Sequence, residues 1–323
     1  MTATRRALLL AAPTLALPAA LRAQGTWPDR PIRWINPGPA GGAGDVLSRL
    51  VGDRLSAKLG QPVVIENRPG AGTNIGMTAV ARAAPDGYTV GLASIASNAA
   101  NKWLYPNMPF DAEKDFAAVG MIALVPNIVV VPPSIPPKTL PEFIAWAKGL
   151  GRPLNFGSVG IGSSQHLAAA QFGQITGIEI THAPYNQAGQ MNTDLIEARL
   201  DVLFQSISAV ASMAQAGRMR PIAVSGPSRV PAFPELPTMR EQGVDVTTTG
   251  WFGLATPAGV PEPILAKLDA VLTASLEEEE LRQRIVTGGS IPTIIRRADF
   301  ARFMAEQSET MGQIIRATGA RVN

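Results

Sequence analysis

Three glycine-rich segments, each placed between an apolar run and a stretch with helical periodicity, most constrain the fold of this chain. The first is "NPGPAGGAGDVLSRL" at residues 36–50, the second is "RPGAGTNIG" at 68–76, and the third is "GSVGIGSSQ" at 157–165. Strand, glycine loop and helix in this order form a βα unit. Because such units recur in both halves of the 323-residue chain, the sequence predicts an α/β fold with a mostly parallel sheet in each of two domains.

The glycine loops also predict where a ligand binds. Ligands of open α/β sheets bind at the carboxyl ends of strands, and a glycine loop before a helix lets backbone N–H groups approach an anion. Residues 36–48 contain no lysine, which excludes a nucleotide P-loop, and the G-x-G at Gly42 and Gly44 is not completed because position 47 is Leu. An anion held between loops of the two halves is favoured over a nucleotide. Each loop by itself is equally consistent with a tight turn.

Catalytic and metal chemistry have few candidate residues. The chain has no cysteine, and its two histidines, His166 and His182, are too few for a classical zinc site. No G-x-S-x-G motif is present. Ser163 and Ser164 stand at a predicted helix start, where capping the helix and donating to a ligand are equally expected. We therefore expect no catalytic residue, no metal and no cofactor.

The N-terminus has the layout of an export signal. Arg5 and Arg6 precede the apolar stretch 7–21, which is short for a membrane helix of about twenty apolar residues. Without residues 1–23 the chain keeps 25 basic and 25 acidic side chains, so no basic excess indicates a nucleic-acid surface. The sequence predicts a signal peptide at 1–23, of the Sec or twin-arginine type.

Seven segments carry a family resemblance in combination and in this order. They are "WPDRPIRWINPGPAGGAGDVLSR", "GQPVVIENRPGAGTNIG", "PDGYTVGLAS", "FGSVGIGSSQHLAAAQF", "THAPYNQAG", "GRMRPIAVSGPSRVPAFPELPTMREQG" and "GWFGLATPAGVPEPILAKL". Over nearly the whole mature chain, the sequence resembles the Bug-type periplasmic receptors of tripartite tricarboxylate transporters. The resemblance implies a two-domain periplasmic binding protein of type II, the Venus-flytrap class. It implies domain 1 at 24–125 plus 249–323, domain 2 at 126–248 and a cleft between them.

The same resemblance implies a receptor rather than an enzyme. Such a receptor captures a small carboxylate in the periplasm, closes its two domains on it and delivers it, as a monomer, to the membrane subunits of a tripartite transporter. No nucleic-acid partner is implied. Two alternatives stay open: a carboxylate sensor that partners a membrane kinase, and an exported α/β enzyme. The enzyme is disfavoured because no nucleophile, base and metal constellation is present.

The resemblance places the ligand carboxylate mainly on backbone groups of two loops. The implied residues are Pro39, Ala40, Gly41 and Gly42 in the first loop and Gly160, Ser163, Ser164 and His166 in the third. Neither loop contains lysine or arginine, so N–H dipoles and hydroxyls would meet the charge, at about 1.5–3 kcal/mol per charged hydrogen bond. Asp45 is expected to cap the following helix rather than contact an anion.

Four further ligand candidates lie elsewhere. Ser94 and Asn98 follow the predicted strand "TVGLA", at the strand end that faces the cleft. Gln187 in "PYNQAGQ" and Gln205 in "VLFQS" stand where many members of the family differ, with Asp at the Gln205 position. Glutamine there favours a ligand whose far end is uncharged or hydroxylated over an amino acid. The alternative is that Gln205 only satisfies nearby backbone groups.

Two structural roles are also predicted. Arg68 is expected to pair with Glu66 rather than to clamp a carboxylate. The segment "WFGLATPAG" predicts a strand that returns to the first sheet, and its Trp251 and Phe252 are expected to pack in the core or to wall the pocket.

Overall fold

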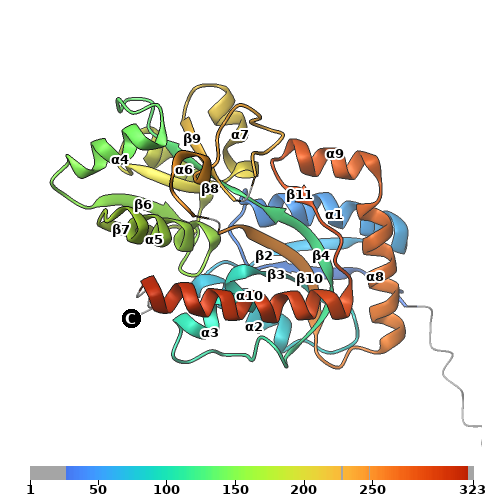
Figure 1. Ribbon diagram of the computed structural model, residues 1–323. Coiled ribbons are helices and arrows are strands. Elements are labelled where there is room, and N and C mark those ends of the chain that lie inside the picture. The colour runs from blue at the N-terminus through green and yellow to red at the C-terminus, as the bar shows by residue number, and fades with distance from the viewer. Residues whose placement is uncertain (1–26, 227, 247, 319–323) are drawn as a thin grey trace, which may run out of the picture.

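The computed structural model describes residues 27–226, 228–246 and 248–318, and it contains two β-sheets (Figure 1). The first sheet has the strand order β11-β4-β10-β3-β1-β2, and the second has the order β7-β6-β8-β5-β9. The strands are β1 Ile32–Asn36, β2 Val63–Asn67, β3 Thr89–Ser94, β4 Phe116–Val125, β5 Asn127–Val131, β6 Leu154–Ser158, β7 Ile180–Pro184, β8 Val202–Ser206, β9 Arg220–Ser225, β10 Gly250–Pro257 and β11 Ile291–Pro292.

Helices cover both sheets. In Figure 1 the second sheet and its helices α4 to α7 lie at the upper left, and the first sheet lies at the centre and right with α1, α8 and α9. The α-helices are α1 Ala43–Leu59, α2 Asn74–Ala81, α3 Asn101–Leu104, α4 Leu140–Lys148, α5 Ser164–Thr176, α6 Ala188–Ile196, α7 Ile207–Gln215, α8 Glu262–Leu276, α9 Glu279–Thr287 and α10 Arg297–Thr318. The 3-10 segments are η1 Ala71–Thr73 and η3 Arg240–Gln242, and η2 Ala96–Ala100 is a π-helix.

Most strands of each sheet run in one direction, as predicted. In the first sheet β1 is parallel to β2 and β3, whereas β10 runs antiparallel to both β3 and β4 and β11 antiparallel to β4. In the second sheet β6 is parallel to β7 and β8, and β5 runs antiparallel to β8 and β9. The βα units therefore share a direction, and their strands end on the same edge of each sheet.

The chain passes from one sheet to the other at two places. β4 ends at Val125 in the first sheet and β5 begins at Asn127 in the second, so Pro126 is the junction. β10 begins at Gly250 and lies between β3 and β4, which confirms that this segment returns to the first sheet. The sheet changes near the two predicted domain boundaries, 125/126 and 248/249, and the division into two domains stays a prediction.

Helix α1 shows how the sequence determines a local element. The side chains that recur every four residues are buried, and they are Leu47, Val51, Leu55 and Leu59. Gly60 ends the helix with a left-handed φ of 70°, and its N–H donates to the Ser56 carbonyl at 3.0 Å. A glycine adopts this conformation without steric cost, so α1 ends at Leu59.

Apolar clusters fill both faces of each sheet. The face of the first sheet opposite α1 and α8 packs against α2, η2 and α10, and this cluster also holds Leu167 of α5. Helix α10 runs along this face and touches α5 beside the second sheet (Figure 1). Among the residues that the structure describes, no helix is both long enough and apolar enough to span a membrane.

Candidate functional site

A cavity of about 70 Å³ lies between the carboxyl ends of strands from both sheets. The loops after β1 and β3 and the adjoining ends of β4 and β10 line one side, and the loops after β6 and β8 line the other. At about 10–15 Å³ per water molecule it holds on the order of five waters, which suits a small ligand. Its lining residues are Asn36, Pro37, Gly38, Pro39, Gly42, Ala43, Gly44, Thr73, Ser94, Ile95, Ala96, Val125, Val159, Ser163, Ser164, Gln165, Ser206, Gly250, Trp251 and Phe252.

The N-terminus of α1 faces this cavity and has no side-chain cap. Gly42 is the N-cap residue in an extended conformation, and Ala43 and Gly44 begin the helix and line the cavity. The N–H groups of a first helical turn have no carbonyl partner inside the helix. The positive end of the dipole of this 17-residue helix therefore points to the cavity, where it stabilises an anion.

Two side chains hold the first loop in shape. Asn36, at the end of β1, donates from Nδ2 to Asn67 Oδ1 at 3.1 Å. The Asp45 carboxylate accepts from the Gly41 N–H at 2.9 Å and from Asn67 Nδ2 at 3.0 Å. The expectation that Asp45 caps α1 is wrong, because the N-cap is Gly42 and the carboxylate reaches back to brace the loop.

Helix α5 presents a second N-terminus to the same cavity. Ser163 is its N-cap, and the Ser163 hydroxyl accepts from the His166 N–H at 3.3 Å and donates to the Gly160 carbonyl at 2.7 Å. Ser164 and Gln165 begin the helix and line the cavity. The capping role of Ser163 is confirmed, and the first-turn N–H groups of Ser164 and Gln165 have no partner inside the helix.

The ends of β3 and β8 complete the walls. Ser94 ends β3, and its hydroxyl lies 3.0 Å from the hydroxyl of Ser97. Asn98 lies behind it, because its Oδ1 accepts from the Ser94 N–H at 3.3 Å and from the Ser97 hydroxyl at 2.6 Å. Ser206 ends β8 and is the N-cap of α7, again without a side-chain cap. A third α-helix N-terminus thus adjoins the cavity.

The cavity wall carries no charged side chain and no histidine within the described ranges. Several of its polar side chains are occupied within the protein: Ser164 Oγ, for example, donates to Asn127 Oδ1 at 3.3 Å. Thr73 Oγ1 is buried without a partner among the described residues. Helix N-terminal N–H groups, rather than cationic side chains, are the principal positive features that a ligand meets here.

The predicted ligand residues divide into two groups. Those that line the cavity are Pro39, Gly42, Ser94, Ser163 and Ser164. Those outside its lining are Ala40, Gly41, Asn98, Gly160, His166, Gln187 and Gln205. Gln187 is exposed at the N-cap of α6, and the Gly41 N–H is already donated to Asp45. Ligand contact by each of these residues stays a prediction.

Gln205 lies one layer behind the wall. It is 1% exposed, and its Oε1 accepts from Gln165 Nε2 at 2.7 Å and from the Ser206 N–H at 2.8 Å. Its Nε2 is buried and has no partner among the described residues. Since Gln165 lines the cavity, this hydrogen bond connects Gln205 to the cavity wall. Gln165 is the second residue of the helix that follows the third glycine loop, and this place in the sequence could have indicated it.

Sequence reasoning also missed Asn36, Thr73 and Ser206. Each stands at a strand end or in a glycine loop, so the rule that ligands bind at strand ends would have found them. Trp251 fulfils both expected roles: it is 1% exposed, contacts Phe300 edge to face and lines the cavity. The predicted pairing of Arg68 with Glu66 is confirmed at 2.7 Å.

The two histidines form a separate cluster beside a second cavity of about 500 Å³. Their ring centroids are 4.6 Å apart, and both rings stack on Phe156. His166 Nδ1 accepts from the Gly162 N–H, and His182 Nε2 lies 2.6 Å from the Ser158 hydroxyl. Burial lowers the pKa of His166 to about 4, and burial with the nearby His166 lowers that of His182 to about 3. Both rings are therefore neutral packing groups at pH 7, and the described chain has no set of three metal-ligand side chains.

Comparisons with known proteins agree with this geometry. Residues 47–320 match the model of the "Tripartite tricarboxylate transporter family receptor". The chain is 31% identical to BugT of Bordetella pertussis over 92% of both chains. It is 33% identical to Rpa4515 of R. palustris, solved with adipate, with a TM-score of 0.88 over 91% of this chain and 98% of that one. MatC of Rhodopseudomonas palustris, solved with malate, is 28% identical with a TM-score of 0.84, over 90% and 100% of the two chains.

Proposed function

The chain belongs to the tripartite tricarboxylate transporter receptor family, and from that membership we propose that it captures a small carboxylate by domain closure and delivers it to the membrane subunits of such a transporter. Receptors of this family are periplasmic solute-binding proteins and not enzymes. In the proposed mechanism the carboxylate lies in the cavity between the two sheets. It lies against Pro37, Gly38, Pro39 and Gly42 of the first loop and against Val159 and Ser163 of the third.

The observation that carries this proposal is the convergence of two helix N-termini on one cavity without cationic side chains. The first-turn N–H groups of Ala43 and Gly44 come from α1, and those of Ser164 and Gln165 come from α5. Backbone N–H groups bind an anion without the side-chain entropy that lysine or arginine loses. Three or four charged hydrogen bonds at about 1.5–3 kcal/mol each match the roughly 8 kcal/mol of micromolar binding.

Similar proteins support a carboxylate as the ligand. Rpa4515 is solved with adipate and MatC with malate, both at more than 80% coverage of this chain. Adipate and malate differ in length and substitution and share carboxylate groups. The two ligands thus share the anionic group that a helix N-terminus is suited to bind.

Gln205 and Gln165 indicate the charge of the end of the ligand that lies away from the carboxylate. An acid at position 205 would attract an ammonium group, whereas the amide of Gln205 carries no charge and hydrogen bonds to Gln165. We therefore propose that the far end of the ligand is uncharged or hydroxylated and is not an amino-acid ammonium. The alternative role for Gln205, satisfying backbone, also has support, because its Oε1 accepts from the Ser206 N–H.

Two other functions share parts of this geometry. A carboxylate sensor for a membrane kinase would use the same cavity, so only the identity of the membrane partner separates it from a transport receptor. An exported α/β enzyme is disfavoured because the cavity wall, among the described residues, has no histidine, carboxylate or cation to act in a reaction.

The proposal is tested by a thermal-shift screen of the mature protein. The panel holds mono-, di- and tricarboxylates, amino acids and aromatic acids, each paired with its uncharged amide. A ligand at 100 times its Kd stabilises the folded protein by about 2.7 kcal/mol, which shifts the Tm measurably. We expect stabilisation by at least one acid and none by its amide. A panel without any stabilising carboxylate would overturn the proposal, and co-purification with transporter or kinase subunits decides the partner.

A further inference from the structure

The second and third glycine loops touch each other beside the cavity. A Cβ atom built on Gly72 would lie 2.8 Å from the Ile161 carbonyl oxygen and 2.4 Å from Tyr105 Oη. A Cβ atom on Gly160 would lie 3.5 Å from Gly72 Cα. These residues belong to opposite sides of the cavity, because Gly72 precedes α2 on the first sheet and Ile161 precedes α5 on the second. Glycine at both positions lets the two backbones approach this closely.

Asn101 lies between these two loops. It is fully buried at the start of α3, and its Nδ2 donates to the Gly72 carbonyl and to Asn74 Oδ1, both at 2.7 Å. Its Oδ1 is buried, has no hydrogen-bond partner in the described part of the chain and would lie 2.5 Å from a Cβ atom on Gly162. Asn101 thus fixes the second loop with one end of its amide, while the other end lies against the third loop.

Apolar side chains of the third loop and α5 extend this contact. Ile161 packs against the cluster of the first sheet that holds Ala100 and Leu104, and Leu167 is a fully buried member of it. Neither Ile161 nor Leu167 lines the cavity. Separating the two sides would expose both side chains to water, so the contact favours closure without any ligand.

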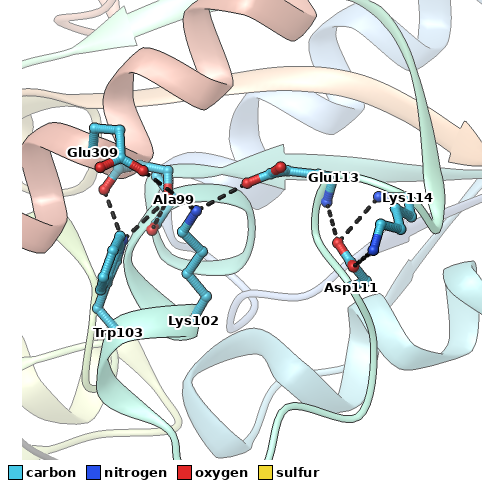
Figure 2. Close-up of polar contacts among 8 residues, drawn as sticks. Ala99, Lys102, Trp103, Asp111, Glu113, Lys114 and Glu309 are labelled. Atoms are coloured by element: carbon cyan, nitrogen blue, oxygen red, sulfur yellow. Dashed lines mark hydrogen bonds and ion pairs between the residues drawn. The ribbon is translucent and has the colours of Figure 1, made fainter.

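The first-sheet side of this contact is anchored to α10 (Figure 2). Figure 2 shows Lys102, next to Asn101, between Glu113 and Glu309, with Nζ to Glu113 Oε1 at 2.9 Å and to Glu309 Oε1 at 3.8 Å. Trp103 Nε1 donates to the Ser308 carbonyl at 2.8 Å. The segment that carries Asn101 is therefore held to α10 by contacts outside the ligand cavity.

The π-helix η2 leads into this surface. The Ser308 hydroxyl of α10 donates to the Ala99 carbonyl at 2.9 Å, and the Asn101 N–H, which follows η2, donates to the Ala96 carbonyl. Ala96 lines the cavity at the other end of the same short element. π-helical turns occur frequently at functional sites, and this one connects the ligand cavity to Asn101.

We propose that Asn101, residues 70–72, Ile161 and Gly162 form a latch that holds the two proposed domains closed and so sets the affinity for the carboxylate without touching it. This inference rests on the proposed function for its ligand and on the contacts above for its mechanism. Apparent affinity scales with the fraction of ligand-free molecules that are closed. A tenfold fall in the closed fraction therefore raises the apparent Kd tenfold. This change in affinity comes from the latch, while the contacts between ligand and cavity stay the same.

The test compares two buried asparagines. Asn101→Ala removes the latch amide, and Asn192→Ala is the matched control. Asn192 is also buried, donates from Nδ2 to a main-chain carbonyl and has an Oδ1 with no partner among the residues that the structure describes. Because the chain has no cysteine, Lys114→Cys and Lys148→Cys place one dye on each side of the cavity for single-molecule FRET. Circular dichroism verifies that each variant is folded.

Gly162→Ala is a second variant, and it adds a methyl group that meets Asn101 Oδ1 only when the latch is closed. Its control is Gly177→Ala, because Gly177 has a similar positive φ of 70° and no heavy atom within 4 Å of the built Cβ. Without ligand, we expect Asn101→Ala and Gly162→Ala to lower the closed FRET population at least fivefold. We expect neither control to change it.

The carboxylate found in the thermal-shift screen then gives the second readout. We expect the Kd to rise by the same factor as the closed population falls, mainly through faster dissociation. Unchanged FRET in both latch variants, or an equal change in the controls, would overturn the latch. A protein that binds no carboxylate would overturn the proposed function, and the ligand-free FRET comparison would still decide the latch.

Discussion

Gln165 Nε2 donates to Gln205 Oε1 at 2.7 Å, which joins a residue of the cavity wall to a buried residue of β8. The two residues come from different βα units, 40 positions apart. A charge on the side chain at position 205 would therefore lie one hydrogen bond behind the cavity wall. This relationship makes position 205 a direct test of ligand chemistry.

Gln205→Glu is expected to weaken carboxylate binding at pH 7 by about tenfold, or about 1.4 kcal/mol, because a second negative charge is placed one residue from the cavity. Isothermal titration with the ligand and with its α-amino analogue measures the change. The analogue is expected to lose less affinity, since its ammonium group is attracted. The control is Gln171→Glu on α5, the helix that also carries Gln165. The Oε1 atom of Gln171 accepts from Thr248, which lies outside the cavity. An equal loss in both variants would show that charge at position 205 has no special effect.

Gly44→Ala is expected to lower the free energy of unfolding by about 1–3 kcal/mol through overpacking. The added Cβ would lie 2.9 Å from Leu92 Cδ2 of β3 and 3.0 Å from Asn36 Oδ1 at the end of β1, and both residues are fully buried. Urea unfolding measures the change. Gly189→Ala, also near a helix start but with no heavy atom within 4 Å, is expected to gain about 0.5–1 kcal/mol instead. A loss of similar size at both positions would contradict the packing argument.

Asp45→Ala is expected to lower stability by about 1–3 kcal/mol and to weaken carboxylate binding, because the Gly41 N–H and Asn67 Nδ2 lose their shared acceptor. Burial alone would raise the pKa of Asp45, but the hydrogen bonds from Gly41, Arg49 and Asn67 outweigh it and hold the pKa below its ordinary value. The contribution of Asp45 is therefore present above that ordinary value and is lost as the pH falls through the folded-state pKa. Urea unfolding at several pH values measures this, with the exposed Asp53→Ala as control. Equal effects of the two substitutions would show that the hydrogen bonds of the Asp45 carboxylate to Gly41 and Asn67 contribute nothing to the free energy of unfolding.

Acid is expected to destabilise the protein through its two histidines. Their pKa values are lowered to about 4 for His166 and about 3 for His182, whereas an unfolded histidine titrates near 6.5. Between about pH 6.5 and 4 the unfolded chain binds protons that the folded chain excludes, so the free energy of unfolding falls by about 1.4 kcal/mol per pH unit for each histidine. His166→Gln, compared with the wild type in urea titrations across this range, is expected to flatten the slope. A slope that is the same in both proteins would refute the assignment to His166.

Local elements follow from the sequence because their determinants are close together along the chain. The four-residue spacing of buried side chains in α1 and the left-handed Gly60 after it are properties of 18 consecutive residues. The Ser163 cap of α5 and the Arg68–Glu66 pair are similarly local. Seven motifs in order were enough to indicate the family, and residues 47–320 match its model.

The candidate site could be predicted only in outline. The family resemblance indicated Pro39, Gly42, Ser163 and Ser164, and the strand-end rule indicated Ser94; all five line one cavity. The same reasoning did not distinguish a residue in the wall from one behind it. Asn98 and Gln205 sit behind Ser94 and Gln165 because hydrogen bonds to those residues turn their side chains away from the cavity.

By itself the sequence determined the βα units, their helix limits and the family, because hydrophobic period, glycine position and motif order act over short distances. Only the tertiary structure decided which loops meet: Asn101 lies against Gly162, and the Asp45 carboxylate turns back to Gly41 instead of capping its helix. The contact of Asn101 with Gly162 depends on how the two sheets pack against each other, and the turn of the Asp45 carboxylate is shared with Asn67 at the end of β2. Packing is set by the shapes of side chains distant in sequence, which no local pattern contains.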